Sequence, residues 1–246
     1  MRLSDPSIRI PPFERELPWI NTAALRADQQ RGRPVLVEFW DFCRINSLRT
    51  LPYIRAWHER YAAAGLRVIG IHTGAFACSR ELEAIEAAVA RLEITYPVCV
   101  DSDLLMWDWY GNQGWPARYL WEPEQSLFSV HYGEGAYADT EREIGELLGI
   151  EVDPLPPLRP EEAEGVLLEA QTADQMGAYC GPFEAGGVHL VCSGVGDVLV
   201  NGVALTVERC DVYTALEFER HTVGELEIVA ADGVAVLQTC FTPGLA

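Results

Sequence analysis

Lysine is absent from this chain of 246 residues, so arginine alone supplies its side-chain positive charge apart from histidine. The 18 arginines face 37 aspartates and glutamates, and the formal net charge is −19. Binding to nucleic acid or to an anionic membrane depends on basic patches that displace counterions. The composition therefore argues against both classes of partner.

Long apolar runs are missing as well. No stretch approaches the roughly 18 consecutive apolar residues of a membrane-spanning helix. The N-terminal residues MRLSDPSIRIPPFERELP show neither the basic segment nor the apolar core of a signal peptide. We therefore expect a cytoplasmic protein with no membrane span.

Cysteine and histidine are present, but not at the spacings that build sites. None of the seven cysteines forms a Cys-x-x-Cys motif, and no two of the five histidines are three or four residues apart. Zinc sites usually show such spacings. We predict neither a metal site nor a bound cofactor.

A proline- and acid-rich stretch, GIEVDPLPPLRPEEAEG, divides the chain between residues 149 and 165. Such composition is typical of an extended connector. We expect a first domain over residues 1–150, a linker over 151–165 and a second domain over 166–246. Forty-nine per cent of the residues are hydrophobic, and the length allows two small domains with cores of their own.

The first part alternates strand and helix patterns. Apolar runs predict strands at 35–40, 66–73 and 96–101, and a hairpin at 117–121 and 126–132. Helices are expected at 48–61, ending before Gly65, at 79–92 with Ser79 as N-cap, at 104–110 and at 140–148. This order predicts an α/β sheet with parallel strands and an antiparallel hairpin at its edge.

The second part consists of short alternating runs separated by Gly, Asn and Asp turns, which predicts a small all-β sandwich.

In combination, the stretches VLVEFW, LRTLPY, RVIGIHT and WYGNQGWPARYL resemble the thioredoxin-like domain of the TlpA/DipZ type, over roughly residues 11–148. The resemblance implies an active site at the start of the helix after residue 40. It also implies a cis peptide bond before Pro116 and a peptide-binding groove beside Trp115 and Pro116. The segment from Val212 to Gly244 resembles the jelly-roll domain that follows in DipZ-type proteins and looks like a carbohydrate-binding module.

The sequence departs from that family where the chemistry would occur. The two thiols of the family pattern would fall at Arg44 and Ser47, which cannot exchange disulfides. Glu38 stands where thioredoxins keep a buried acid that takes up the proton of the resolving thiol. The alternative for Glu38 is an ordinary carboxylate paired with an arginine.

Cys43 lies at the junction of strand and helix beside Arg44, and both features lower the pKa of a thiol. It is a candidate nucleophile, or else a small side chain that fills the loop. Cys78 follows the next strand, and loops at the carboxyl ends of parallel strands gather at one sheet edge. Cys78 could therefore approach Cys43 as a second thiol; otherwise it simply packs before Ser79.

Three functions remain open. The first is a redox-inactive binding protein that holds a protein or peptide with Arg44, Ser47, Trp115 and Pro116. The second is a monothiol oxidoreductase or peroxidase-like enzyme that uses Cys43 and Glu38. The third is a structural subunit whose β domain forms a homodimer. A weaker expectation is a carbohydrate site, for which the second domain offers Tyr179, Phe183, Tyr213, Phe218 and Phe241.

Overall fold

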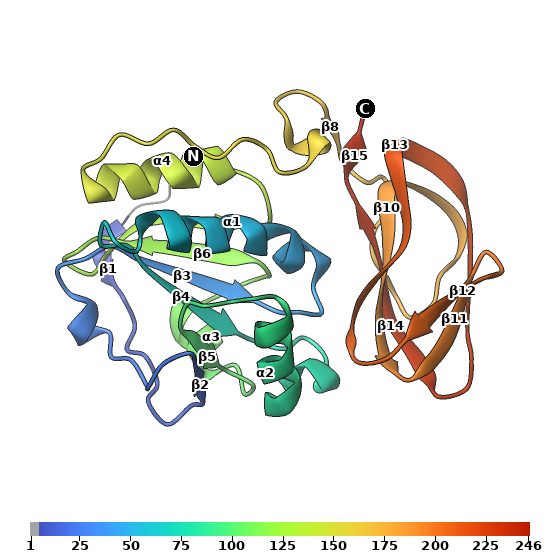
Figure 1. The fold of residues 1–246 in the computed structure, drawn as a ribbon, viewed down its shortest axis with the longest axis horizontal. Coiled ribbons are helices and arrows are strands. Elements are labelled where there is room, and N and C mark those ends of the chain that lie inside the picture. Colours follow the sequence, from blue (N-terminus) through green and yellow to red (C-terminus); the bar gives the residue numbers. More distant parts are fainter. Residues whose placement is uncertain (1–4) are drawn as a thin grey trace. The chain divides into compact units, whose positions relative to one another are not determined.

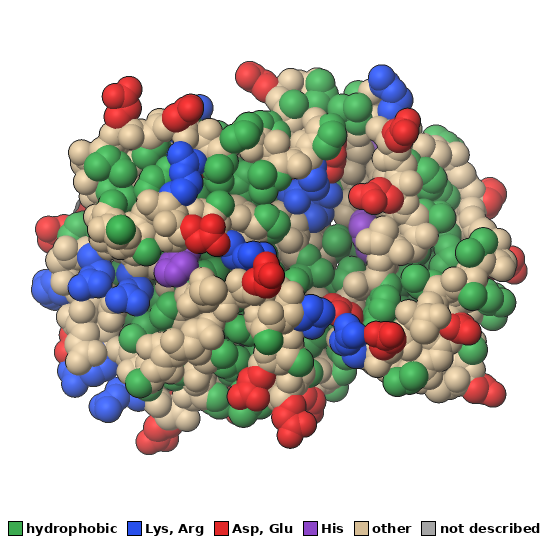
Figure 2. All heavy atoms as spheres, in the orientation of Figure 1, with side chains coloured by type: hydrophobic (Ala, Val, Ile, Leu, Met, Phe, Trp, Pro, Cys, Tyr) green, Lys and Arg blue, Asp and Glu red, His purple; other side chains and the backbone are tan. Residues whose placement is uncertain are grey.

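The computed structural model describes residues 5–246, and the chain divides into two compact units after Pro156. Figure 1 shows a unit of mixed helices and strands followed by a unit of strands. The division falls inside the stretch expected to be a linker. Acidic side chains are spread over the face drawn in Figure 2. No helix within residues 5–246 is both long and apolar enough to cross a lipid bilayer.

The described part of the N-terminal unit contains a seven-stranded mixed sheet in the order β1-β7-β6-β3-β4-β5-β2. The central strands β3, β4 and β5 run parallel, whereas β6 and β7 form the expected antiparallel hairpin. The strands are β1 (Asp5–Arg9), β2 (Trp19–Ile20), β3 (Val35–Trp40), β4 (Arg67–His72), β5 (Val98–Val100), β6 (Ala117–Trp121) and β7 (Ser126–Tyr132). The short edge strands β1 and β2 were not expected from the sequence.

Helices cover both faces of this sheet (Figure 1). The α-helices are α1 (Ile45–Tyr61), α2 (Leu82–Arg91), α3 (Leu105–Tyr110) and α4 (Tyr137–Leu148), with short 3-10 turns at Asp28–Gln30 and Ala77–Arg80. The assignment of Ser79 as a helix N-cap was wrong. Ser79 lies inside the 3-10 turn, its hydroxyl bonds to Asp41 and Phe76, and α2 begins after Glu81.

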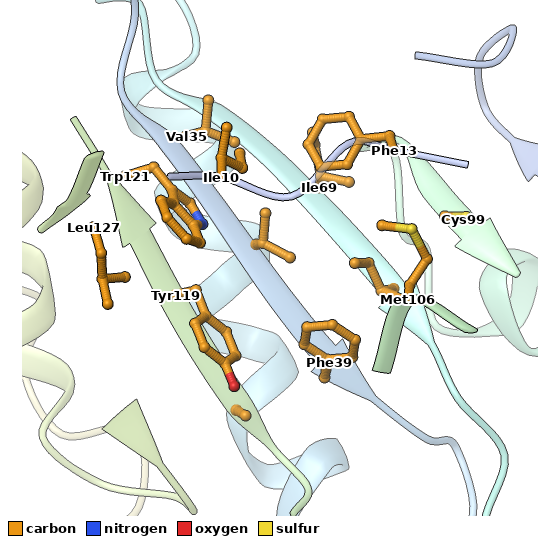
Figure 3. Packing of buried hydrophobic residues seen from close by; sticks show 13 residues of the cluster. Ile10, Phe13, Val35, Phe39, Ile69, Cys99, Met106, Tyr119, Trp121 and Leu127 are labelled. Atoms are coloured by element: carbon orange, nitrogen blue, oxygen red, sulfur yellow. The ribbon is translucent and has the colours of Figure 1, made fainter. Parts of the chain in front are cut away.

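Alternate residues of β3 face opposite sides of the sheet. Val35, Val37 and Phe39 join a buried cluster with Met106 of α3, shown in Figure 3. Leu36, Glu38 and Trp40 point to the other face, which α1 and α4 cover. Because all six residues of β3 are buried, a charged residue in this strand has no direct access to solvent.

The C-terminal unit is all β, as expected. Its main sheet has the order β12-β11-β13-β10-β14-β9, and a small separate pair joins β15 to β8. The strands are β8 (Leu167–Leu168), β9 (Gln175–Met176), β10 (Cys180–Gly194), β11 (Gly196–Val200), β12 (Val203–Val207), β13 (Asp211–Ala230), β14 (Val234–Thr242) and β15 (Gly244–Leu245); a 3-10 turn covers Pro160–Glu162. Although short runs were expected throughout this unit, Asp211–Ala230 form the single long strand β13. Register shifts in its pairing with β10 break the regular ladder, as β-bulges do.

The aromatic residues proposed as a carbohydrate platform belong to the core of this unit. Phe183 and Phe241 are buried and stacked on one another, and Phe218 stacks on Phe183. Tyr179 and Tyr213 are partly buried against the same cluster. Because a sugar stacks on an exposed ring, these five residues do not provide the platform that the expectation required.

Candidate functional site

The start of α1 holds Arg44 and Ser47, the residues at the two positions where the family pattern has thiols. Arg44 is the N-cap of α1 in an extended conformation, and the helix proper begins at Ile45. Ser47 is completely buried, and the Asp41 N–H donates to its hydroxyl at 3.3 Å. The first turn of α1 leaves backbone N–H groups without helical partners, at the position that the sequence resemblance gives to the active site.

Arg44 lies against aromatic side chains. Its guanidinium carbon is 5.3 Å from the ring centre of Phe76 and 4.9 Å from that of Trp115. Trp115 is held in turn by its indole N–H, which donates to Thr73 Oγ1 at 2.8 Å. The peptide bond between Trp115 and Pro116 is cis. Arg44 and Trp115, which were expected to share a binding surface, thus lie against one another beside Pro116.

The structure also brings Cys43 and Cys78 together. Their Sγ atoms lie within 4.8 Å of one another, although the residues come from loops after different strands. Cys43 is completely buried, and Cys78 is half-buried in the 3-10 turn before α2. Cys78 is disulfide-bonded in the structure. The sulfur atom beside Cys43 is therefore an oxidised one, which a thiolate can attack.

Asp41, a completely buried residue, ties the two cysteine loops together. Its Oδ1 accepts the N–H of Cys43 at 2.9 Å, and its Oδ2 accepts the N–H of Ala75 at 2.8 Å and the Ser79 hydroxyl at 3.3 Å. A carboxylate that accepts several hydrogen bonds tolerates burial. Asp41 therefore fixes the loop of Cys43 against the loop of Cys78.

Gly74 allows the second loop to fold this tightly. A β-carbon built on Gly74 would lie 2.5 Å from the carbonyl oxygen of Ser79, closer than real β-carbons approach backbone. Any other residue would therefore push the 3-10 turn of Cys78 outward.

Glu38 lies in the middle of β3, completely buried. Neither carboxylate oxygen has a hydrogen-bond partner within residues 5–246. Burial raises its pKa to about 8, and the nearby positive charge of Arg118 offsets this only in part. Arg118 lies opposite Glu38 on β6, yet no hydrogen bond joins them. An ordinary ion pair with an arginine is therefore not what the structure contains.

The sequence reasoning missed Asp41 and Thr73. Asp41 directly follows a fully buried strand, and an acid at that position is a signal that could have identified it. The hydroxyl of Thr73, just beyond β4, gave no comparable signal. His72 is completely buried, stacks on Phe42 and meets Trp40 edge-on. Its Nε2 lies 3.5 Å from Asp41 Oδ1.

Known proteins that are similar to this chain include thioredoxin-like proteins and a thiol-disulfide oxidoreductase. No protein-family model matches the chain. Protein DipZ of Mycobacterium tuberculosis is 34% identical over 133 residues, which are 53% of this chain but 19% of DipZ. The thiol-disulfide oxidoreductase YkuV of Bacillus subtilis is 24% identical over 148 residues, 60% of this chain and 97% of YkuV. The chain thus spans about a fifth of DipZ and nearly all of YkuV.

Solved structures are similar over the same share of the chain. A thioredoxin-like superfamily protein superposes with a TM-score of 0.54 and 20% identity, over 60% of this chain and all of that one. A thioredoxin-like protein in its oxidised form gives a TM-score of 0.51 and 22% identity, over 61% and 98%. At these identities the similarity concerns the fold.

Proposed function

Because this chain is a thioredoxin-fold protein of the TlpA/DipZ type, we propose that it carries out thiol–disulfide exchange through Cys43 and Cys78. These two cysteines would supply the sulfur atoms that Arg44 and Ser47 cannot. The observation that carries the proposal is the approach of the two Sγ atoms to within 4.8 Å at the edge where the family places its active site.

The exchange step needs one thiolate and one disulfide. Cys43 loses its proton to water and attacks Cys78 Sγ, and the disulfide that Cys78 carries breaks. The displaced sulfur leaves as a thiolate with the bonding electrons, and a Cys43–Cys78 disulfide forms. An external dithiol reductant, which is itself oxidised, returns both cysteines to thiols. Cys43 acts as the buried resolving thiol, and Cys78 is the sulfur that meets other thiols.

Mapping of disulfides tests this proposal. The full-length chain would be incubated at several ratios of reduced to oxidised glutathione, trapped with acid, alkylated and digested. We expect a Cys43–Cys78 disulfide that increases with the oxidised fraction and disappears in Cys43→Ser and in Cys78→Ser. Cys180→Ser, which removes an exposed thiol of the C-terminal unit, is the matched control and should change nothing. Cys43 that stays fully alkylated at every ratio would refute the proposal.

A second candidate, a binding function without redox chemistry, is favoured by the surface of Arg44, Trp115 and Pro116. A guanidinium packed on two rings presents both hydrogen-bond donors and a flat apolar area to an extended peptide. Under this function, labelled peptides should bind to Cys43→Ser as well as to the wild type in fluorescence anisotropy. Arg44→Ala should weaken binding several-fold, whereas the exposed Arg26→Ala should not. Equal binding by Arg44→Ala would exclude the surface.

A further inference from the structure

A cavity of 340 Å³ lies in the N-terminal unit between α4 and the strands of the sheet, away from the start of α1. Leu36 of β3 and Leu120 of β6 contribute apolar walls, and Ser129 of β7 with Thr140 and Glu143 of α4 contribute polar ones. This volume is at the lower end of the range found for small-molecule sites. The cavity is therefore large enough for a compact organic molecule.

Arg118 is the buried charge that lines this cavity. Its side chain is only 2% exposed. Nη2 donates to the Gly135 carbonyl at 2.5 Å, but Nε and Nη1 have no hydrogen-bond partner among the described residues. The guanidinium packs over the rings of Trp57 and Tyr137, at 5.8 and 5.2 Å. Leaving N–H groups of a buried cation unsatisfied is costly, so this arrangement favours an acceptor in the cavity.

No carboxylate of the described chain is bonded to Arg118. Glu38 is its neighbour across the sheet, but burial raises the pKa of Glu38 to about 8, so that this side chain is mostly protonated at neutral pH. Glu143 accepts the Ser129 hydroxyl at 2.5 Å, and Asp139 pairs with Arg142 at the exposed rim. Burial lowers the pKa of Arg118 to about 10, which still leaves it positively charged at pH 7.

We propose that the cavity under α4 binds a small organic carboxylate on Arg118. The planar guanidinium matches the two oxygens of a carboxylate, which can accept two hydrogen bonds at once. The other acids of the lining, Asp139 and Glu143, disfavour a ligand with several negative charges. A monocarboxylate therefore suits the cavity better than inorganic phosphate.

Binding is tested on the full-length chain with acetate, lactate and inorganic phosphate at constant ionic strength, in chloride buffer. The readouts are isothermal titration calorimetry and the NMR signals of the His131 ring, which lines the cavity. We expect saturable binding of acetate or lactate, with shifts of the His131 signals, and phosphate binding that is at least tenfold weaker. Phosphate binding as tight as the carboxylates would refute the ligand class, and no saturable binding of either carboxylate would refute the site.

Three variants assign the binding to the cavity. Arg118→Gln should weaken carboxylate binding by about tenfold or more, the loss expected for a hydrogen bond to a charged group. Thr140→Leu fills part of the cavity and leaves the charge of Arg118 in place, so it should abolish binding. This variant tests the site independently if Arg118→Gln does not fold. Arg26→Gln, which removes an exposed arginine outside the cavity lining, is the matched control and should change affinity less than threefold. Binding retained in Thr140→Leu would place the carboxylate elsewhere and overturn the proposal.

Discussion

Glu38 is the residue whose environment departs most from that of the free side chain. Its pKa is raised to about 8 by burial, against 4.5 for the ordinary group. The folded chain therefore holds this proton more tightly than the unfolded chain does. The stability that follows is fully present below about pH 4.5 and is lost as the pH rises toward 8.

Replacement of Glu38 by glutamine should remove this dependence. Because one pKa unit corresponds to about 1.4 kcal/mol, the free energy of unfolding of Glu38→Gln relative to the wild type should be roughly 4 kcal/mol higher at pH 8.5 than at pH 5. Urea unfolding at both pH values measures it. The exposed Glu86→Gln on α2 is the control and should show no such difference. An equal effect of Glu38→Gln at both pH values would mean that the carboxylate is solvated.

Asp41 supports a second prediction at the scale of the residue. Asp41→Ala leaves the N–H groups of Cys43 and Ala75 without their acceptors, and each loss costs about 1–3 kcal/mol. We expect a free energy of unfolding lower by roughly 3 kcal/mol, together with a smaller yield of the Cys43–Cys78 disulfide. Asp28→Ala, at an exposed ion pair with Arg26, is the control. Unchanged disulfide yield would show that Asp41 does not position the loops.

Among the elements, α1 can be tested for whether its first turn still supports a pair of redox-active cysteines. Arg44→Cys with Ser47→Cys places two thiols at the N-cap and in the first turn, where the helix dipole and N–H groups stabilise a thiolate. Cys43→Ser is added to prevent scrambling. We expect a reversible disulfide between residues 44 and 47 and a thiol pKa below 8.5, the usual value.

A redox titration and a pH titration of alkylation rate measure these two properties of the triple variant. The Cys43→Ser single variant is the control. A disulfide that forms without a lowered thiol pKa would show that the N-terminus of α1 does not stabilise a thiolate, and would favour the binding function over a lost redox site.

Strands and helices followed from the sequence where apolar patterns were long and regular. The run VLVEFW predicted β3, and the stripe of Leu51, Ile54 and Trp57 predicted α1. Two local patterns misled. Ser79 has the side chain of a good N-cap, but Asp41 draws its hydroxyl into a tertiary hydrogen bond. Glycines were expected to mark turns between short strands of the second domain, yet β13 continues through Gly224, which pairs with Phe183 of β10.

Parts of the candidate site depend on contacts that no local pattern encodes. The resemblance pointed to Arg44, Ser47 and Trp115 as candidate site residues. Topology only allowed Cys43 and Cys78 to approach one another, and it is the structure that places their Sγ atoms within 4.8 Å. The stacking of Arg44 on Phe76 and the bond from Trp115 to Thr73 join segments far apart in sequence. Only the folded chain reveals them.

For the whole molecule, the division into two units has a thermodynamic consequence. The C-terminal unit, residues 157–246, has its own buried cluster around Phe183, Leu190 and Phe241. We expect a fragment of these residues to unfold cooperatively on its own, and Phe183→Ala to destabilise it by about 3–5 kcal/mol. Circular dichroism during urea unfolding measures both, with the exposed Val223→Ala as control. A fragment without a cooperative transition would refute an independent core.

Dimerisation through the C-terminal unit stays a prediction, which sedimentation equilibrium of the full-length chain would test.

The pairing between β10 and β13 also predicts the order in which their residue pairs form during refolding. Its innermost pair, Cys192 and Asp211, closes the shortest loop, and its outermost pair, Cys180 and Glu227, closes the longest. Since the entropy of loop closure grows with loop length, pairing should start beside the β11–β12 hairpin and spread outward. In pulse-labelled hydrogen exchange during refolding, the amide of Val191 should then be protected earlier than that of Gly181. The start of β10 is accordingly the part of this strand that stays unpaired with β13 for longest during refolding.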